Sequence, residues 1–125
     1  MIPLLFSIVV LFWVSGFDII YSLQDEEFDK IYNLHSIPVL NGKEKALYIS
    51  RLLHVIAIIT MIFIGFVGNF NHFYWIGTII FSILIIYQHN IVNINDLSNI
   101  NLAFFTTNGI ASIIFGIFVI LDILI

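Results

Sequence analysis

Charged residues are scarce in this sequence, and cysteine is absent. Only 10% of the 125 residues are Asp, Glu, Lys or Arg, whereas 61% are hydrophobic. A soluble domain carries about 25% charged residues, so this composition excludes almost any soluble fold. The absence of cysteine excludes disulfides, thiolate metal sites and thiol nucleophiles. A net charge of −4 leaves no basic patch for a nucleic acid, and we expect a lipid bilayer to be the main partner.

Four stretches with few or no charges are long enough to cross a membrane as helices. They cover residues 1–17, 46–68, 70–88 and 102–125. None shows two-residue alternation, and a helix satisfies its own backbone hydrogen bonds in lipid. The sequence therefore predicts an all-α fold, a polytopic membrane bundle of four transmembrane helices forming part of one domain over 1–125.

The basic residues predict the orientation of this bundle. All four of them, Lys30, Lys43, Lys45 and Arg51, lie in or beside the loop 18–45, which joins the first two spans. Because Lys and Arg are enriched in cytoplasmic loops, we expect this loop to face the cytoplasm. The chain is then an integral protein of the bacterial inner membrane or its equivalent.

The acidic residues after the first span follow a helical spacing. If the first helix continues past Phe17, Asp25 and Asp29 lie within about 20° of Asp18 around its axis, and Tyr21 about 60° away. Carboxylate oxygens suit Mg²⁺, which usually takes one or two of them together with waters and substrate phosphates. The segment thus predicts either a magnesium–diphosphate site at the membrane surface or a solvated acidic turn.

The extended acidic pattern has a known counterpart. Asp18-x-x-Tyr21-x-x-x-Asp25-x-x-x-Asp29 resembles the second aspartate-rich motif of the UbiA family of intramembrane aromatic prenyltransferases. The subgroup of 4-hydroxybenzoate polyprenyltransferases is the most similar. Further segments similar to the same family are Trp13-Val-Ser-Gly-Phe-Asp18, Leu34-His-Ser-Ile-Pro38, Ser50-Arg-Leu-Leu-His54 and Asp96-Leu-Ser-Asn-Ile-Asn-Leu-Ala-Phe-Phe-Thr-Thr-Asn-Gly109.

The resemblance implies a reaction and roles for particular residues. Asp25 and Asp29 would bind the Mg²⁺ that holds a polyprenyl diphosphate, and Asp18 and Tyr21 would be catalytic residues near the reacting carbon. The prenyl group would pass to an aromatic acid such as 4-hydroxybenzoate, in ubiquinone or menaquinone biosynthesis. Other acceptors used within this chemistry are haem, chlorophyllide or a glyceryl phosphate.

The sequence departs from the family pattern in one respect, because it has only one of the family's two aspartate-rich motifs. The resemblance implies a nine-helix bundle with two aspartate-rich motifs, and the first motif, N-D-x-x-D-x-x-x-D, is absent from this sequence. The four spans match the last four helices of that bundle. We therefore expect a C-terminal fragment that is inactive alone and that needs the missing N-terminal half of the enzyme as a partner.

Three further residues are candidates for substrate binding, each with an ordinary alternative. His35 is equally consistent with a histidine in an interfacial loop. Arg51 is also typical of an arginine that anchors a span at the membrane surface. Asn108 also fits an amide that pairs with a neighbouring helix. A fourth polar residue, His89, is expected in a loop.

The alternative function of the chain is that of a small non-catalytic membrane subunit with a solvated acidic loop.

Overall fold

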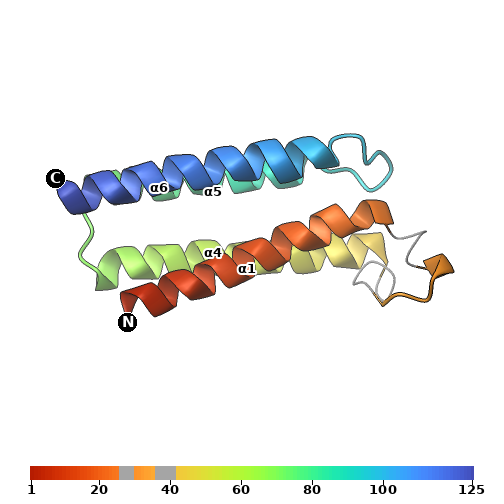
Figure 1. The fold of residues 1–125 in the computed structure, drawn as a ribbon, viewed down its shortest axis with the longest axis horizontal. Helices are drawn as coiled ribbons and strands as arrows, with labels where there is room; N and C mark the ends of the chain where they lie inside the picture. The colour runs from red at the N-terminus through yellow and green to blue at the C-terminus, as the bar shows by residue number, and fades with distance from the viewer. Residues whose placement is uncertain (26–29, 36–41) are drawn as a thin grey trace.

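The protein is a bundle of four long helices. The computed structural model describes residues 1–25, 30–35 and 42–125, with the side chains of these residues except Asp25, Ala103 and Phe104. Figure 1 shows two layers, α1 beside α4 and α5 beside α6, with both chain termini at the same end. The elements are α1 (Ile2–Ser22), the short 3₁₀ helix η1 (Leu23–Asp25), α4 (Lys43–Val67), α5 (His72–Ile91), the π-helix η2 (Leu102–Thr107) and α6 (Asn108–Leu124).

All four long helices have the length and hydropathy needed to cross a membrane. The spans are Ile2–Ser22, Lys43–Val67, His72–Ile91 and Phe105–Leu124. The part of the chain that the structure describes holds no β-strand beyond an isolated bridge between Asn93 and Asp96. The predicted all-α polytopic bundle is confirmed.

The helices differ from the predicted spans at their ends. α1 extends past Phe17 to Ser22, and α4 begins at Lys43, inside the segment predicted as a loop. An apolar run marks the part of a helix that suits lipid, whereas helical hydrogen bonds continue through polar residues until a breaker occurs. No glycine or proline lies between residues 17 and 25, so the helical backbone carries the first acidic positions out of the apolar zone.

Two buried clusters hold the layers together. Near the chain termini, Tyr74 is fully buried, donates its hydroxyl to the Met61 carbonyl at 2.7 Å and contacts the rings of Phe6, Phe70 and Phe115. The other cluster lies toward the acidic end of α1 and contains Ile19, Ile20, Leu23, Ala46, Leu47, Val92 and Ile100.

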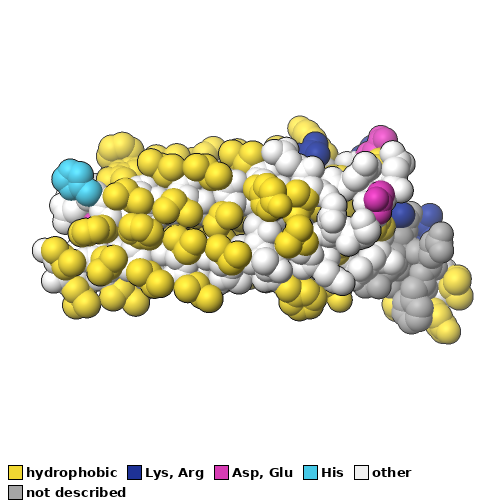
Figure 2. Space-filling view, turned by 90° about the horizontal axis from the view of Figure 1, so that it is seen from above, with side chains coloured by type: hydrophobic (Ala, Val, Ile, Leu, Met, Phe, Trp, Pro, Cys, Tyr) yellow, Lys and Arg dark blue, Asp and Glu magenta, His cyan; other side chains and the backbone are white. Residues whose placement is uncertain are grey.

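The outer surface of the bundle is rich in hydrophobic side chains, unlike the surface of a soluble protein. Figure 2 shows hydrophobic side chains covering most of one face of the bundle, while Lys, Arg, Asp and Glu gather toward one end. Large exposed apolar side chains occur on all four helices, including Leu11, Ile59, Ile83 and Ile117. Such a surface is stable only where the surrounding medium is itself apolar.

A carboxylate near the end of α6 caps the start of α5. Asp122 is only 6% exposed, and its two oxygens accept the backbone N–H groups of Asn71 at 2.9 Å and Tyr74 at 3.1 Å. The first N–H groups of a helix have no partner within the helix, and the side chain of the N-cap residue Asn71 makes no capping bond here. Asp122 therefore fixes α6 against α5 through the cap.

We predict that Asp122→Ala lowers the free energy of unfolding by about 1–2 kcal/mol, because it leaves buried helix N–H groups without an acceptor. The measurement is thermal or denaturant unfolding in detergent micelles. Asp96→Ala is the matched control, since Asp96 accepts the Ser98 N–H at 3.1 Å in an exposed loop. Equal losses in the two variants would contradict the capping role.

Candidate active site at the acidic end of the bundle

Asp18 and Tyr21 lie on the same side of α1. They are separated by about 60° around the helix axis. Asp18 is exposed, and Tyr21 is half-buried with its ring packed edge-on against Phe105 of η2, the centroids 6.1 Å apart. The structure thus brings together a carboxylate, a phenol ring and the π-helix that precedes α6.

The backbone carries position 25 back to the same side. Leu23, which caps α1, has helical dihedral angles (φ −58°, ψ −35°) and leads directly into η1. At about 100° per residue in α1 and about 120° in a 3₁₀ turn, residue 25 lies within about 40° of Asp18 around the axis. This agrees with the predicted spacing of the acidic positions.

The metal site itself stays a prediction. The side chain of Asp25 is not described, and Asp29 lies outside the described residues. Among the side chains that are described, no group of three or more His, Asp or Glu could hold a metal ion. Asp18, which is predicted as a catalytic residue and not as a metal ligand, is an exposed carboxylate. Its oxygen atoms are of the kind that Mg²⁺ prefers, so this described residue fits a magnesium site in its chemistry.

The π-helix η2 brings a second element to this end. Its wide turn is closed by the Thr107 hydroxyl, which donates to the Leu102 carbonyl at 3.1 Å. π-helical turns are rare and frequently occur at functional sites. Asn108 follows directly, is 8% exposed and accepts a hydrogen bond from Gln88 Nε2 of α5 at 2.9 Å. The structure shows Asn108 joining two helices, and its contact with substrate stays a prediction.

The other two predicted binding residues are both exposed. Arg51 is exposed on α4 and lines, with Glu44, Asn90 and residues of α5 and the following loop, an open cleft of about 460 Å³. His35 is exposed in the described segment 30–35. The structure therefore groups Asp18 with Tyr21, while Arg51 faces the seam between α4 and α5.

A histidine pair was missed by the sequence reasoning. His89 lies in α5 and not in a loop, which corrects that expectation, and its Nε2 is 2.7 Å from Nδ1 of the buried His54. The two residues lie toward the same end of consecutive antiparallel helices. This shared position in two neighbouring spans could have predicted the pair from the sequence, because a polar residue inside a span favours a partner on a neighbouring helix.

One exposed carboxylate near this end has a local role. The backbone N–H of Ser98 donates to Asp96 Oδ1 at 3.1 Å and holds the pKa of Asp96 below its usual value. Asp96 thus stays ionised and stabilises the turn between α5 and η2. This geometry agrees with a loop residue and makes Asp96 a suitable control for the acidic residues of α1.

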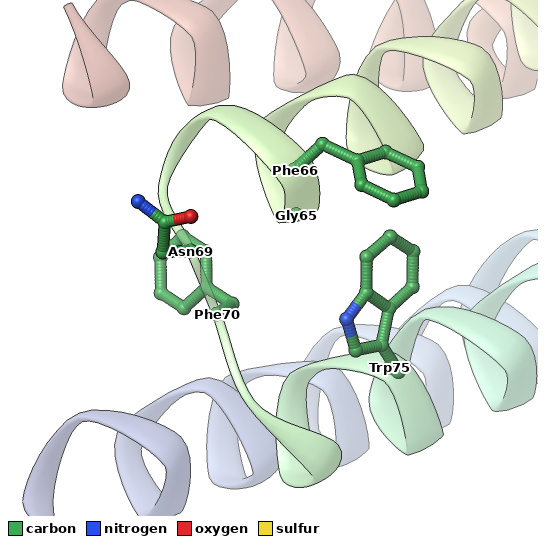
Figure 3. A pocket seen from close by; sticks show the side chains of 5 residues that line it. All are labelled: Gly65, Phe66, Asn69, Phe70 and Trp75. Carbon is green, nitrogen blue, oxygen red and sulfur yellow. The ribbon is translucent and has the colours of Figure 1, made fainter.

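A cleft at the opposite end has a different character. Gly65, Phe66, Asn69, Phe70 and Trp75 line about 480 Å³ at the turn between α4 and α5 (Figure 3). Phe66 and Trp75 face each other across the seam, their ring centroids 5.0 Å apart. Among the residues that the structure describes, no ionisable side chain lines this cleft, so they offer it no group for acid–base or metal chemistry.

The fold and the acidic end define an α-helical integral membrane protein with a candidate site at one end of its spans. The model of the UbiA prenyltransferase family matches residues 1–110. The chain therefore belongs to the UbiA prenyltransferase family, as the resemblance of its acidic motif predicts.

Curated relatives carry the name 4-hydroxybenzoate octaprenyltransferase. The protein of that name from Francisella tularensis subsp. mediasiatica is 31% identical over 116 residues, which are 93% of this chain and 40% of the relative. The one from Francisella tularensis subsp. novicida is 29% identical over 111 residues, covering 89% of this chain and 39% of the relative. The chain thus spans about two fifths of the length of these relatives. No solved structure matches the chain.

We predict that Gln88 and Asn108 contribute to stability as a pair. A double-mutant cycle of Gln88→Leu and Asn108→Leu should give a coupling energy of about 0.6 kcal/mol, the average for hydrogen bonds between membrane helices, and at most about 1.7 kcal/mol. Unfolding in detergent measures it. A cycle of Gln88→Leu with Ser112→Ala is the control, because Ser112 bonds within α6 to Gly109. Zero coupling in the Gln88–Asn108 cycle would contradict the pairing.

Proposed function

We propose that this chain is the C-terminal part of a prenyltransferase that moves a prenyl group from a polyprenyl diphosphate to an aromatic acid such as 4-hydroxybenzoate. One observation carries the proposal. The family match over residues 1–110 includes the acidic motif, and Asp18 and Tyr21 of that motif lie together on an outward side of α1. The acceptor is proposed from the name that the relatives carry. With that acceptor, the proposed pathway is quinone biosynthesis, either of ubiquinone or of menaquinone.

The acidic residues have distinct proposed roles. Asp25 and Asp29 would hold Mg²⁺, with Asp18 beside them at the end of α1. Bound Mg²⁺ would supply positive charge to stabilise the leaving diphosphate. Asp18 would also favour the positive charge that develops on the allylic carbon as its bond to oxygen lengthens, because opposite charges attract more strongly near an apolar medium than in water.

Tyr21 supports the same step with its ring. An aromatic face attracts a cation, at about 0.5–2 kcal/mol depending on desolvation. The contact of the Tyr21 ring with Phe105 limits the orientations that this ring adopts. The apolar surfaces of the four helices would accommodate the prenyl tail, which has no polar group to satisfy.

The orientation follows from charge. Lys30, Lys43, Lys45 and Arg51 lie between the first and second spans or at the start of the second. We propose on the positive-inside rule that this loop and the acidic end of α1 face the cytoplasm, where a water-soluble aromatic acid and Mg²⁺ have access to them.

The proposed activity requires more than this chain. The chain covers 40% of a relative's length and carries one aspartate-rich motif of the two implied by the family resemblance. We propose that the missing N-terminal half supplies the other metal ligands and the basic residues for the diphosphate. The isolated chain is therefore expected to show no turnover with prenyl diphosphate, Mg²⁺ and 4-hydroxybenzoate.

The test replaces the corresponding C-terminal part of a full-length relative with residues 1–125 and measures prenyl transfer in membranes. We predict that Asp25→Asn or Asp29→Asn lowers kcat/KM at least about 100-fold, the order found when one group that stabilises charge in the transition state is removed. Asp96→Asn is the matched control and should leave turnover within about twofold, because Asp96 stabilises only a loop turn.

Two results would contradict the proposal. Unchanged turnover in Asp25→Asn and Asp29→Asn would favour the alternative of a solvated acidic loop in a non-catalytic membrane subunit. Equal losses in these variants and in Asp96→Asn would show that any change of carboxylate disturbs the protein, and the acidic motif would then have no special role.

A further inference from the structure

Two polar side chains of α4 reach across to backbone carbonyls of α1. Ser50 is fully buried and donates its hydroxyl to the Gly16 carbonyl at 2.8 Å. His54 is 2% exposed, and its Nε2 lies 3.1 Å from the Trp13 carbonyl. The donors are one turn apart on α4, and the acceptors are three residues apart on α1. Two such bonds between one pair of helices fix both the depth and the rotation of α1 relative to α4.

The histidine ties the same contact to a third helix. A carbonyl only accepts hydrogen bonds, so His54 Nε2 carries the hydrogen in its bond to Trp13. In the neutral imidazole, Nδ1 is then an acceptor, and Nε2 of His89 at 2.7 Å must be the donor. His54 thus donates to α1 and accepts from α5. Both bonds require the same tautomer of His54, the one with its hydrogen on Nε2.

Gly16 makes this contact specific. A Cβ atom added at position 16 would lie 2.3 Å from Cδ2 and Nε2 of His54, which is far inside van der Waals contact. The imidazole is held at both nitrogens and is almost fully buried, so it has little freedom to move away. The backbone of α1 therefore packs directly against the histidine ring. A side chain at position 16 would collide with this ring.

This contact lies on the side of α1 opposite the candidate site. Asp18 is two residues after Gly16 and therefore about 200° from it around the axis. Tyr21 shares the side of Asp18 and contacts Phe105 of η2. Any rotation of α1 on α4 turns Asp18 and Tyr21 by the same angle relative to η2.

We propose that Ser50 and His54 are positioning residues of the prenyl-transfer site: they hold α1 at the rotation and depth at which the Tyr21 ring contacts Phe105 of η2 and Asp18 lies exposed on the same side of α1. Neither residue contacts substrate. The inference rests on the proposed function for its catalytic consequence, and on the hydrogen bonds described above for its structural part. Because misplacement of a reacting group by about 1 Å can cost about 100-fold in rate, a small shift of α1 is sufficient to impair turnover.

The structural part is tested on the 125-residue chain itself. The sequence has no cysteine, so Leu11→Cys and Ile117→Cys, at sites 62% and 52% exposed, allow paired spin labels on α1 and α6. Ser50→Ala should shift or broaden the measured distance distribution. Ser82→Ala is the matched control, because Ser82 donates at the same 2.8 Å length to Thr78 within its own helix. An unchanged distribution in Ser50→Ala would overturn the inference.

The catalytic part uses the chimeric full-length enzyme described above. Ser50→Ala should lower kcat about 10-fold or more with a smaller change in the KM for prenyl diphosphate, while Ser82→Ala keeps kcat within about twofold. His54→Gln keeps an N–H for the Trp13 carbonyl and should retain more activity than His54→Leu. Equal kcat in Ser50→Ala and Ser82→Ala, or equal losses in His54→Gln and His54→Leu, would overturn the catalytic part.

The two experiments separate this inference from the proposed function. A chimera that shows no prenyl transfer with the unaltered sequence contradicts the proposed function and the catalytic part together. The spin-label distances need no turnover, so they still decide whether Ser50 and His54 set the position of α1.

Discussion

The structure depends on the hydrogen bonds that several buried polar side chains of the apolar spans make to another helix. Lipid offers no hydrogen bonds, and an unsatisfied group there costs several kcal/mol. Three pairs show how these bonds order the bundle. Ser50 bonds to Gly16 and joins α4 to α1, Gln88 bonds to Asn108 and joins α5 to α6, and Asp122 accepts the N–H of Tyr74 at the far end of the same two helices. Apolar packing brings the helices together, and these bonds select their rotation.

The same absence of hydrogen-bond partners in lipid explains where chemistry is located. Among the residues that the structure describes, Lys, Arg, Asp and Glu gather toward one end of the bundle (Figure 2), whereas the carboxylate of Asp122 caps α5 near the other end. α1 continues through that boundary because no breaker follows Gly16 before residue 25. Asp18 and Tyr21 are therefore held by a helix that is anchored deep in the bundle while their side chains lie at its end. Under the proposed function, Mg²⁺ held by the acidic groups would join the end of this helix to the diphosphate of a substrate with an apolar tail.

The sequence predicts the features that depend on composition and on spacing within one helix. Four apolar runs predict the four spans, and the interval between Asp18 and Tyr21 predicts their common side. Contacts between helices could not be predicted in this way. Ile, Leu, Val and Phe occupy all faces of each helix, so the sequence does not indicate which face packs against a neighbour. His89 was expected in a loop because the predicted third span ends at residue 88, although it lies in α5 and pairs with His54. The roles of Asp25 and Asp29 follow from resemblance and stay predictions.

The central claim is that the acidic end of α1 binds a divalent metal together with a diphosphate. Affinity cleavage tests it most directly: Fe²⁺ replaces Mg²⁺ in the presence of a prenyl diphosphate, and ascorbate with peroxide then cuts the backbone next to the bound iron. In the chimeric full-length enzyme, the account predicts that cuts within residues 1–125 are confined to residues 18–29, are suppressed by excess Mg²⁺ and are lost in Asp25→Asn. Cuts centred on Asp96 or Asp122, or cuts that persist in Asp25→Asn, would contradict it.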